Sequence, residues 1–405
     1  MLIRPENPGA TKRNDTKENR DIVRPKADQP ELVGQTSASP KTKTPPASNA
    51  KPRNGALIGL PGPRGVGGTP QVGKRGVFSA IDLGTNNCRL LVARPTRDGF
   101  RVIDAFSRIV RLGEGVAESG ELSEAAMQRT IDALKICANK IEKRRVTCMR
   151  HVATEALRVA SNRTSFVERI KHETGLNMEV ISAAEEARLA VLGCQTLIAP
   201  GKRHALVFDI GGGSTELIWV RVDKPNPIEI CGWMSIPWGV VNLTETHREA
   251  SQNGCRISYQ KMVAEVVSHL DSFEEAYQLK NRLKDREVQF LGTSGTVTTL
   301  ASLHMRLPRY DRNLIDGAWM KADEISSLSR EVAAMSEAER ASQPCIGRDR
   351  CDLVVAGCAI LEALLSMWPV EDLRVADRGI REGILRGLME ERQPIVAPTA
   401  SLAAQ

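Results

Sequence analysis

A glycine-rich segment between two carboxylates is the first place where residue types and spacing in this chain suggest chemistry. It begins at Asp209, ends at Glu216 and contains three successive glycines. Glycines without a Cβ expose their backbone N–H groups, and such a nest binds phosphate oxygens. The phosphate-binding candidates of this loop are Gly211, Gly212, Gly213, Ser214 and Thr215. The flanking carboxylates suit a hard cation, Mg²⁺ or another divalent ion, so the pattern favours a phosphate and metal site over a plain hairpin turn.

A second loop, residues 82–89, follows the same logic with fewer glycines. It reads Asp-Leu-Gly-Thr-Asn-Asn-Cys-Arg, and its phosphate-binding candidates are Asp82, Gly84, Thr85, Asn86 and Arg89. Alone this loop is weak evidence for a site. Together with the first loop it indicates a cleft between two phosphate loops, which can hold a polyphosphate.

The elements around the two loops repeat. Apolar segments at 77–81 and 205–208 each end in an aspartate, and further strands follow the loops at 89–93 and 217–220. Because the period is far too long for a solenoid, we expect two related α/β halves that face a cleft. Further strands are expected at 151–153, 178–181 and 289–291. Helices are expected at 123–145 and 183–195, with Ser123 and Ser182 as N-caps, and near 259–284, 296–304, 322–336, 350–366 and 379–390.

The charge of the chain is concentrated in its first 75 residues. The whole chain of 405 residues carries +7, whereas residues 1–75 alone carry fourteen Lys and Arg against six acidic residues and contain no aromatic residue. We expect this tail to be disordered, and the near-neutral body is then an unlikely general nucleic-acid binder. Residues 68–74 fit the start of a Walker A loop, but Arg75 stands where Ser or Thr is required, so no phosphate loop is expected there.

Cysteine usage and hydropathy favour a cytoplasmic protein with no membrane contact. The nine cysteines form no C-x-x-C pair, so neither a disulfide framework nor a zinc site is expected. The N-terminus lacks the apolar core of a signal peptide. The most apolar stretch, 353–370, is interrupted by Glu362 and Pro369 and is typical of a buried helix.

Six motifs in a fixed order resemble the exopolyphosphatase / guanosine pentaphosphate phosphatase family of the actin, sugar-kinase and heat-shock-chaperone superfamily. Besides the two loops they lie at 153–162, 181–188, 291–296 and 350–357 with 377–383, so the resemblance covers about 76–390. It implies an α/β fold with two actin-like (ribonuclease H-like) domains that flank a phosphate-binding cleft. We expect a disordered tail at 1–75, a first domain at 76–200, a second domain at 201–391 and a flexible end at 392–405. One arrangement that the resemblance allows is that the last helix of the second domain packs on the first domain.

The resemblance also implies roles for individual residues. Glu186 matches the family's catalytic base, and Asp209 and Glu216 match its metal-associated carboxylates. Residues that match phosphate contacts are Gly84, Thr85, Asn86, Arg158, Gly211, Gly212, Gly213 and Ser214. The stretch that meets the purine side in relatives with nucleotide substrates corresponds to Gly292, Thr293, Ser294 and Gly295.

The expected function is therefore release of terminal orthophosphate from inorganic polyphosphate, from guanosine pentaphosphate, or from both. A non-hydrolytic sensor of these ligands would need no base, and a kinase of this fold would shield its nucleotide from water, so Glu186 argues against both. Because the sequence stops near residue 405, we expect it to be without the C-terminal helical domains of long relatives; Asn87 also stands where relatives often have Ser. Both expectations leave the choice of substrate open. The resemblance also implies that this chain could form a homodimer, as family members often do.

Overall fold

The computed structural model describes residues 76–222, 228–248, 256–285 and 287–390. The expected tail at 1–75, the Walker-like segment 68–74 and the expected flexible end at 392–405 lie outside the described residues. None of the helices in the described ranges has both the length and the apolar content that a membrane span requires.

The first half is built on a five-stranded sheet in the order β3-β2-β1-β4-β5. Its strands are β1 (Phe78–Leu83), β2 (Asn87–Thr96), β3 (Gly99–Ile109), β4 (Cys148–Ala153) and β5 (Glu179–Val180). The first three strands pair antiparallel through consecutive hairpins, and β4 and β5 add to β1 in parallel. The side chains of β1 are almost all buried, whereas β3, at the edge of the sheet, alternates between half-buried and exposed positions.

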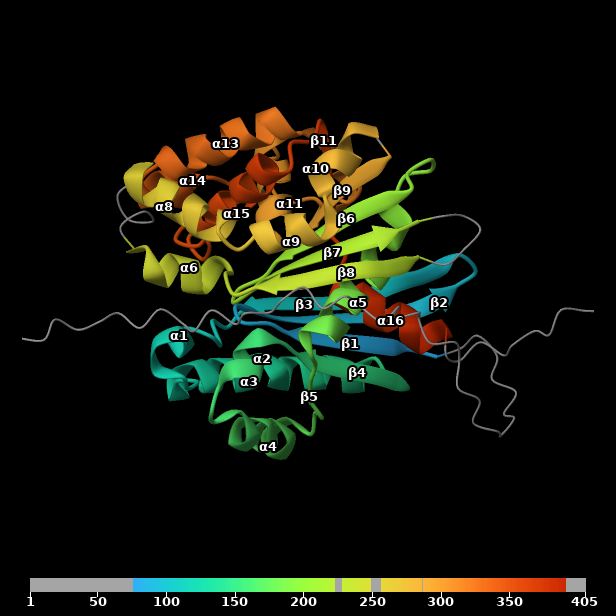
Figure 1. Cartoon of the computed structure of the whole chain (residues 1–405). Helices are drawn as coiled ribbons and strands as arrows, with labels where there is room; N and C mark the ends of the chain where they lie inside the picture. Colours follow the sequence, from blue (N-terminus) through green and yellow to red (C-terminus); the bar gives the residue numbers. More distant parts are fainter. Residues whose placement is uncertain (1–75, 223–227, 249–255, 286, 391–405) are drawn as a thin grey trace, which may run out of the picture. The chain divides into compact units, whose positions relative to one another are not determined.

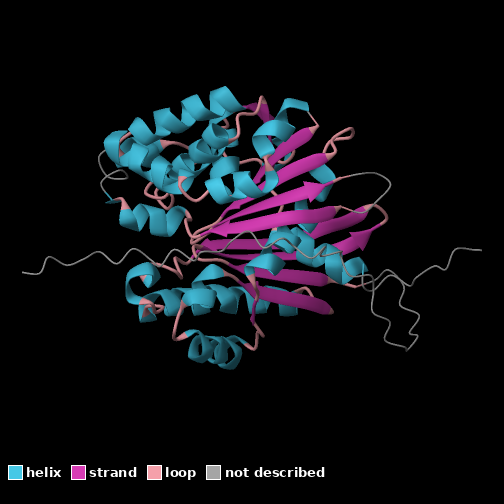
Figure 2. Cartoon of the chain, in the orientation of Figure 1, coloured by secondary structure: helices cyan, strands magenta, loops and turns pink. Residues whose placement is uncertain are grey.

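The second half repeats this pattern in a six-stranded sheet with the order β10-β11-β9-β6-β7-β8. Its strands are β6 (His204–Ile210), β7 (Thr215–Arg221), β8 (Glu229–Ile236), β9 (Val288–Thr293), β10 (Trp319–Lys321) and β11 (Asp372–Ala376). Strands β6, β7 and β8 pair antiparallel, while β9 and β11 continue the sheet in parallel, as β4 and β5 do in the first half. Figures 1 and 2 show the two sheets with their helices. The duplicated α/β fold expected from the sequence is confirmed.

Two predicted helix starts are confirmed in the first half. Ser123 caps α2 through a bond from the amide of Ala126, and Ser182 caps α5 through a bond from the amide of Glu185. The helices of this half are α1 (Val116–Ser119), α2 (Glu124–Lys143), α3 (Glu155–Val159), α4 (Arg163–Thr174) and α5 (Ala183–Cys194), followed by the 3₁₀ turn η1 (Gln195–Leu197).

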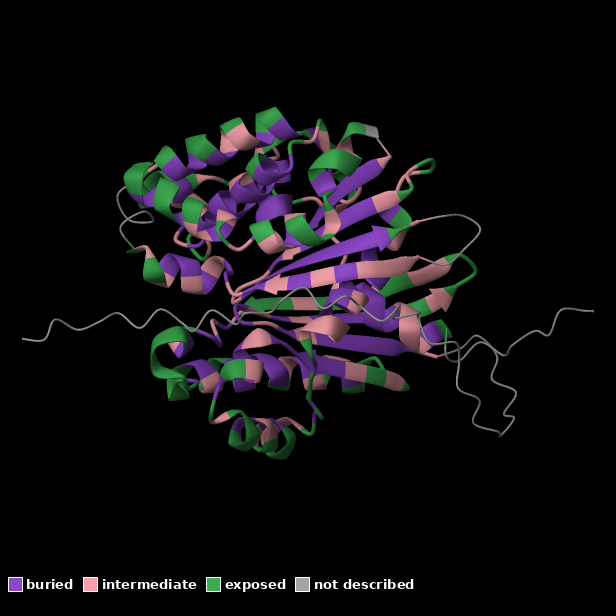
Figure 3. Ribbon diagram, in the orientation of Figure 1, coloured by how far each residue is buried: buried purple, intermediate pink, exposed green. Residues whose placement is uncertain are grey.

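The second half is richer in helices and holds the largest core cluster. Its central helix α15 is buried along almost its whole length (Figure 3). The helices are α6 (Val240–Thr246), α8 (Arg256–Val267), α9 (Asp271–Tyr277), α10 (Leu279–Arg282), η2 (Leu283–Asp285), α11 (Gly295–His304), α12 (Arg312–Ile315), α13 (Ala322–Ala334), α14 (Glu337–Ser342), α15 (Val354–Met367) and α16 (Ile380–Glu390).

One expected helix is wrong. The single helix near 259–284 is instead divided into α8, α9 and α10, and Gln278 between the last two has a left-handed backbone with φ of 50°. Phe273 and Leu279 are both fully buried in one core. In a continuous helix these two side chains would lie about 120° apart around the axis. The left-handed residue between α9 and α10 changes their relative direction, and both are buried in the core.

Helices α5 and α16 cross, and each packs mainly on the sheet of the other half. Apolar side chains of α5 pack with β6, β7 and β9, whereas those of α16 pack with β1, β2 and β4. The crossing is close: a Cβ on Gly193 would lie 2.0 Å from the carbonyl oxygen of Gly379, and one on Gly383 would lie 2.0 Å from that of Leu189. Helix α5 therefore connects the two halves and carries Glu186 in its first turn.

Candidate active site

The two glycine loops are hairpin turns closed in the same way. The amide of Gly84 donates to the carbonyl of Asn87 at 2.9 Å, and the amide of Gly211 donates to the carbonyl of Ser214 at 2.9 Å. In the strands that flank the loops, Asp82 lies opposite Arg89 and Asp209 lies opposite Glu216. The duplication therefore brings two aspartates to equivalent positions at the base of the two turns.

The two loops touch each other, and this contact explains much of the glycine content. A Cβ on Gly212 would lie 2.8 Å from the Cβ of Thr85 and 3.0 Å from the amide nitrogen of Asn86. A Cβ on Gly213 would lie 2.9 Å from the Oγ1 of Thr85, and one on Gly239 would lie 2.4 Å from the carbonyl carbon of Gly212. Since these contacts leave no room for a side chain, the glycines are needed for close approach as well as for open amides.

The second loop keeps its amides open while its carbonyls are bonded. The carbonyls of Gly211 and Gly212 accept from the amides of Val240 and Val241, and Asn242 Nδ2 donates to the carbonyl of Gly213. Within the described part of the chain, the amides of Gly212 and Gly213 have no acceptor. The loop can therefore offer these donors to phosphate oxygens.

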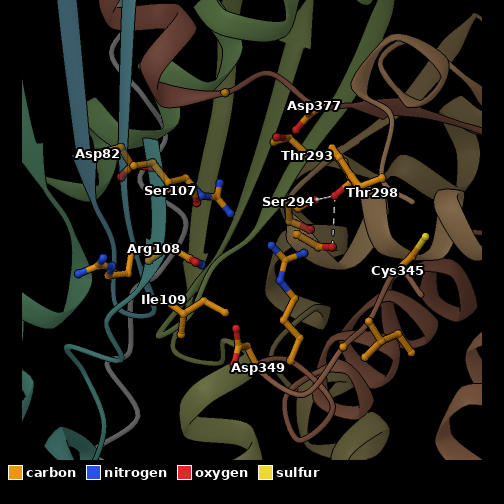
Figure 4. A pocket seen from close by; sticks show the side chains of 18 of the residues that line it. Asp82, Ser107, Arg108, Ile109, Thr293, Ser294, Thr298, Cys345, Asp349 and Asp377 are labelled. Carbon is orange, nitrogen blue, oxygen red and sulfur yellow. Dashed lines mark hydrogen bonds between the residues drawn. The ribbon is translucent and has the colours of Figure 1, made fainter. Parts of the chain in front are cut away.

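Most of the predicted site residues line one small pocket of about 120 Å³. Those it brings together are Asp82, Gly84, Thr85, Asn86, Arg89, Glu186, Asp209, Gly211, Gly212, Gly213, Ser214, Ser294 and Gly295. We call this the inner pocket. It shares Asp82, Arg89 and Asp209 with a wider outer pocket of about 1060 Å³, which Thr293 also lines (Figure 4).

Four predicted site residues line neither pocket. Thr215 is fully buried and donates through Oγ1 to the carbonyl of Trp238 at 2.8 Å. Gly292 lies within β9, where a Cβ would come 2.7 Å from the ring of Phe208. The other two, Arg158 and Glu216, are engaged with polar partners close behind the inner pocket.

Glu186 is a buried carboxylate held by one arginine. Arg158 Nη1 donates to its Oε2 at 2.6 Å, and its side chain is only 9% exposed. Burial raises the pKa of Glu186 well above its usual value; the charge of Glu216 adds to this shift and that of Arg158 opposes it. A carboxylate with a raised pKa at a phosphate pocket is suited to accept a proton from water near neutral pH.

Asp209 and Glu216 are further buried carboxyl groups with raised pKa values. Burial, with the charges of Glu186 and Asp82, raises the pKa of Asp209 to about 7. Burial and the charge of Asp209 raise the pKa of Glu216 to about 7, although Ser214 and Ser235 donate to its Oε1 at 2.7 and 3.0 Å. Negative charge is therefore in excess at the inner pocket.

The donor set at the pocket fits a hard divalent cation. Among the described residues, no group of three or more acidic, His or Cys side chains lies close enough to hold an ion by itself. Mg²⁺ commonly takes only one or two carboxylates together with substrate phosphates and water. Burial, with the charges of Glu186 and Asp82, disfavours the charged form of Asp209, and such a cation would stabilise that form.

The N-terminus of α11 faces the inner pocket. Its cap Ser294 accepts from the amide of Val297 at 3.3 Å, and Ser294 and Gly295 line the pocket. Ser294 has φ of 152°, in the region that favours glycine, so the backbone is strained at this point. The positive end of the helix dipole is thus directed at the site where an anion would bind.

Sequence reasoning missed several residues that line the pockets. The inner pocket is also lined by Asn87, Thr154, Glu155, Thr296, Thr299 and Arg350. Arginines account for much of the outer pocket, namely Arg108, Arg111, Arg129, Arg348, Arg378 and Arg381. With Arg350, these are seven arginines that sequence reasoning missed. The motifs at 350–357 and 377–383 contain three of them, Arg350, Arg378 and Arg381, and could have identified these three. Arg108 on β3 (Figure 4) and Arg348 belong to no motif.

Two α/β halves of the same topology, whose glycine loops meet at a carboxylate-bearing pocket, define the actin-like class of fold. Comparison with known proteins specifies the family. A model of the Ppx/GppA phosphatase family matches residues 91–392, and the chain belongs to this family. The resemblance inferred from the sequence motifs is confirmed, and the chain is accordingly a phosphatase-type hydrolase.

Solved structures of similar proteins agree with this assignment. An exopolyphosphatase-like protein is 28% identical with a TM-score of 0.71, over 78% of this chain and 98% of its own. The Aquifex aeolicus member of the family is 29% identical with a TM-score of 0.62, over 78% and 99% of the two chains. An exopolyphosphatase from Cytophaga hutchinsonii is 25% identical with a TM-score of 0.66, over 78% and 98%.

Proposed function

We propose that this protein hydrolyses the terminal phosphoanhydride bond of inorganic polyphosphate, of guanosine pentaphosphate, or of both, and releases orthophosphate. The observation that carries the proposal is that Glu186 lines the same small pocket as both glycine loops. A base and a set of phosphate donors in one pocket are what hydrolysis requires, whereas a non-hydrolytic sensor needs only the donors.

In the proposed reaction the terminal phosphoryl group binds in the inner pocket. The open amides of Gly212 and Gly213, the loop hydroxyls and the N-terminus of α11 hold its oxygens. Glu186 accepts a proton from a water molecule as the water oxygen bonds to phosphorus. The phosphoanhydride bond on the opposite side breaks, and its electrons stay on the leaving phosphate oxygen. Arg89 and Arg350, which line both pockets, are suited to stabilise that leaving group.

A divalent cation belongs to the proposal. Asp209 would hold it, and Glu216 would support it through water or through Ser214, whose hydroxyl donates to this carboxylate. When bound, the cation would neutralise charge on the phosphate oxygens as the transition state forms.

The rest of the substrate would extend into the outer pocket, where the arginines provide a polyanion site. The name of the Cytophaga hutchinsonii relative supports polyphosphate. Tyr310 in the same pocket has an aromatic ring against which a purine could pack. This ring supports guanosine pentaphosphate as the second candidate substrate. A homodimer and a cytoplasmic location remain predictions.

A direct comparison of the two substrates tests the proposal. Purified full-length protein is incubated with polyphosphate chains of defined length and with guanosine pentaphosphate, each with Mg²⁺ or with a chelator, and orthophosphate is measured. We expect Mg²⁺-dependent release from at least one of them. No release from either substrate with any divalent ion would contradict the proposal.

A further inference from the structure

Glu155 lies at the inner pocket, although no motif suggested a role for it. It is the first residue of α3 and follows Thr154. A Cβ on Gly213 would come 3.1 Å from the Cγ of Glu155, so its stem lies against the glycine loop. Its carboxylate points to Arg158: Oε2 accepts from Nε at 2.8 Å and lies 2.6 Å from Nη2.

Arg158 is divided between two carboxylates. One edge of its guanidinium pairs with Glu155, while Nη1 on the other side donates to Glu186 at 2.6 Å and to the carbonyl of Ile181 at 3.2 Å. The arginine side chain is 16% exposed and lines neither pocket. Since the guanidinium is planar with its donors in a fixed fork, a partner on one edge determines where the opposite nitrogen points.

We propose that Glu155 is a positioning residue: it holds Arg158 so that Nη1 meets Glu186 rather than a substrate phosphate. The inference rests on the proposed role of Glu186 as the base. Without the carboxylate at position 155, the guanidinium is free to turn toward the phosphate oxygens in the pocket. Glu186 then loses its only charged hydrogen-bond donor among the described residues and with it a fixed orientation toward water.

A purely structural role predicts different behaviour. Glu155 and Arg158 are three residues apart on one helix, and an ordinary helix pair of this kind contributes little to stability. Loss of such a pair would lower stability slightly and would leave the turnover number unchanged. Loss of a positioning residue lowers the turnover number while substrate affinity is kept.

Two substitutions and a control separate these roles. In Glu155→Ala we expect kcat for Mg²⁺-dependent phosphate release to fall by about tenfold to a hundredfold, with KM changed by less than about threefold. Glu155→Gln should restore most of the lost turnover, because its amide oxygen can accept from Arg158 Nε. The control is Glu185→Gln, which removes the same charge beside Glu186 from a residue that pairs with Arg150 and Arg188 instead. Its kcat should match the wild type.

A crystal structure of Glu155→Ala gives a readout that does not depend on activity. We expect Arg158 Nη1 to be displaced from Glu186. Retention of that contact, or wild-type kcat in Glu155→Ala, would overturn the inference even if the proposed function holds. If the wild-type protein releases no phosphate, the proposed function fails, and with it the inference; displaced Arg158 would then show only a structural dependence on Glu155.

Discussion

At the scale of residues, the buried carboxyl groups of Asp209 and Glu216 make stability depend on pH. Each has a pKa of about 7, well above the ordinary value near 4. Between these two pH values the folded protein retains protons that the unfolded chain has lost. Stability is therefore full below about pH 4 and decreases as the pH rises toward 7, the reverse of the usual acid denaturation.

The raised pKa values of Asp209 and Glu216 predict how the free energy of unfolding changes with pH. Without divalent metal, the free energy of unfolding should be lower at pH 8 than at pH 5, by about 2 kcal/mol or more, as measured by urea denaturation. Mg²⁺ should reduce the difference, because it stabilises the charged carboxylates. Asp209→Asn should also flatten the profile. Equal slopes in the wild type and in Asp209→Asn would show that this carboxyl group does not titrate as described.

Individual residues of the site were predictable to the extent that they lie in a local motif. The glycine loops could be identified because their neighbours in sequence are also their neighbours in space, whereas Glu186 was singled out only through the family resemblance of the motif at 181–188. The pairing of Arg158 with Glu186 and of Glu155 with Arg158 could not, because it depends on α3 and α5 meeting across the pocket. Asp209 and Glu216 were predictable as carboxylates at the loop, but their raised pKa values come from burial in the folded state.

At the scale of elements, the crossing of α5 and α16 leaves the least room for an added side-chain atom. The Cβ that Gly383→Ala introduces would clash with the carbonyl oxygen of Leu189, a backbone atom that cannot turn away. We expect this substitution to destabilise the protein by about 1–3 kcal/mol or more in urea denaturation. Gly193→Ala should behave in the same way, because it meets the backbone of Gly379.

Helix α16 also contains the matched control. A Cβ on Gly387 would lie 4.0 Å from its nearest neighbour, Leu192 Cδ2. Gly387→Ala should therefore be neutral or should stabilise by up to about 1 kcal/mol, since alanine favours a helix. Equal effects of the substitutions at 383 and 387 would mean that the close crossing is not maintained in solution.

The sequence predicted elements with a clear apolar pattern or a cap and missed four strands, of which three lie at the edge of a sheet. Helices α2 and α5 were found because a capping serine begins each of them. Strands β3, β8, β10 and β11 were missed; β3, for example, is an edge strand with no fully buried side chain, so it lacks an apolar pattern. The break at Gln278 was missed because nothing in the local helical pattern signals a left-handed residue at this position.

At the scale of the whole molecule, the described halves are bound to each other by more than the crossing helices. Arg111, after β3, forms a two-pronged ion pair with Asp352, at 2.8 and 3.1 Å. Glu245 of α6 accepts from the amide of Gly115 at 2.9 Å. Because α5 packs on the second sheet and α16 on the first, neither core is complete without the other half.

Cooperative unfolding should follow from this exchange. All five tryptophans lie in the second half, so their fluorescence reports on that half alone, whereas far-UV circular dichroism reports on both. We expect the two signals to change at the same urea concentration in one transition. Dichroism that changes in two steps, with fluorescence following only one, would show that the halves unfold separately.

We propose that one pocket combines phosphate binding with a base, and Glu186→Gln removes that base while it leaves the phosphate-binding residues in place. The matched control is Glu185→Gln, which alters the neighbouring carboxylate outside the pocket. Turnover is measured with Mg²⁺ and the better of the two substrates, and binding is measured by calorimetry. We predict that Glu186→Gln lowers kcat by about a hundredfold or more and still binds substrate, while the control retains turnover. Full turnover in Glu186→Gln would show that Glu186 is not the base.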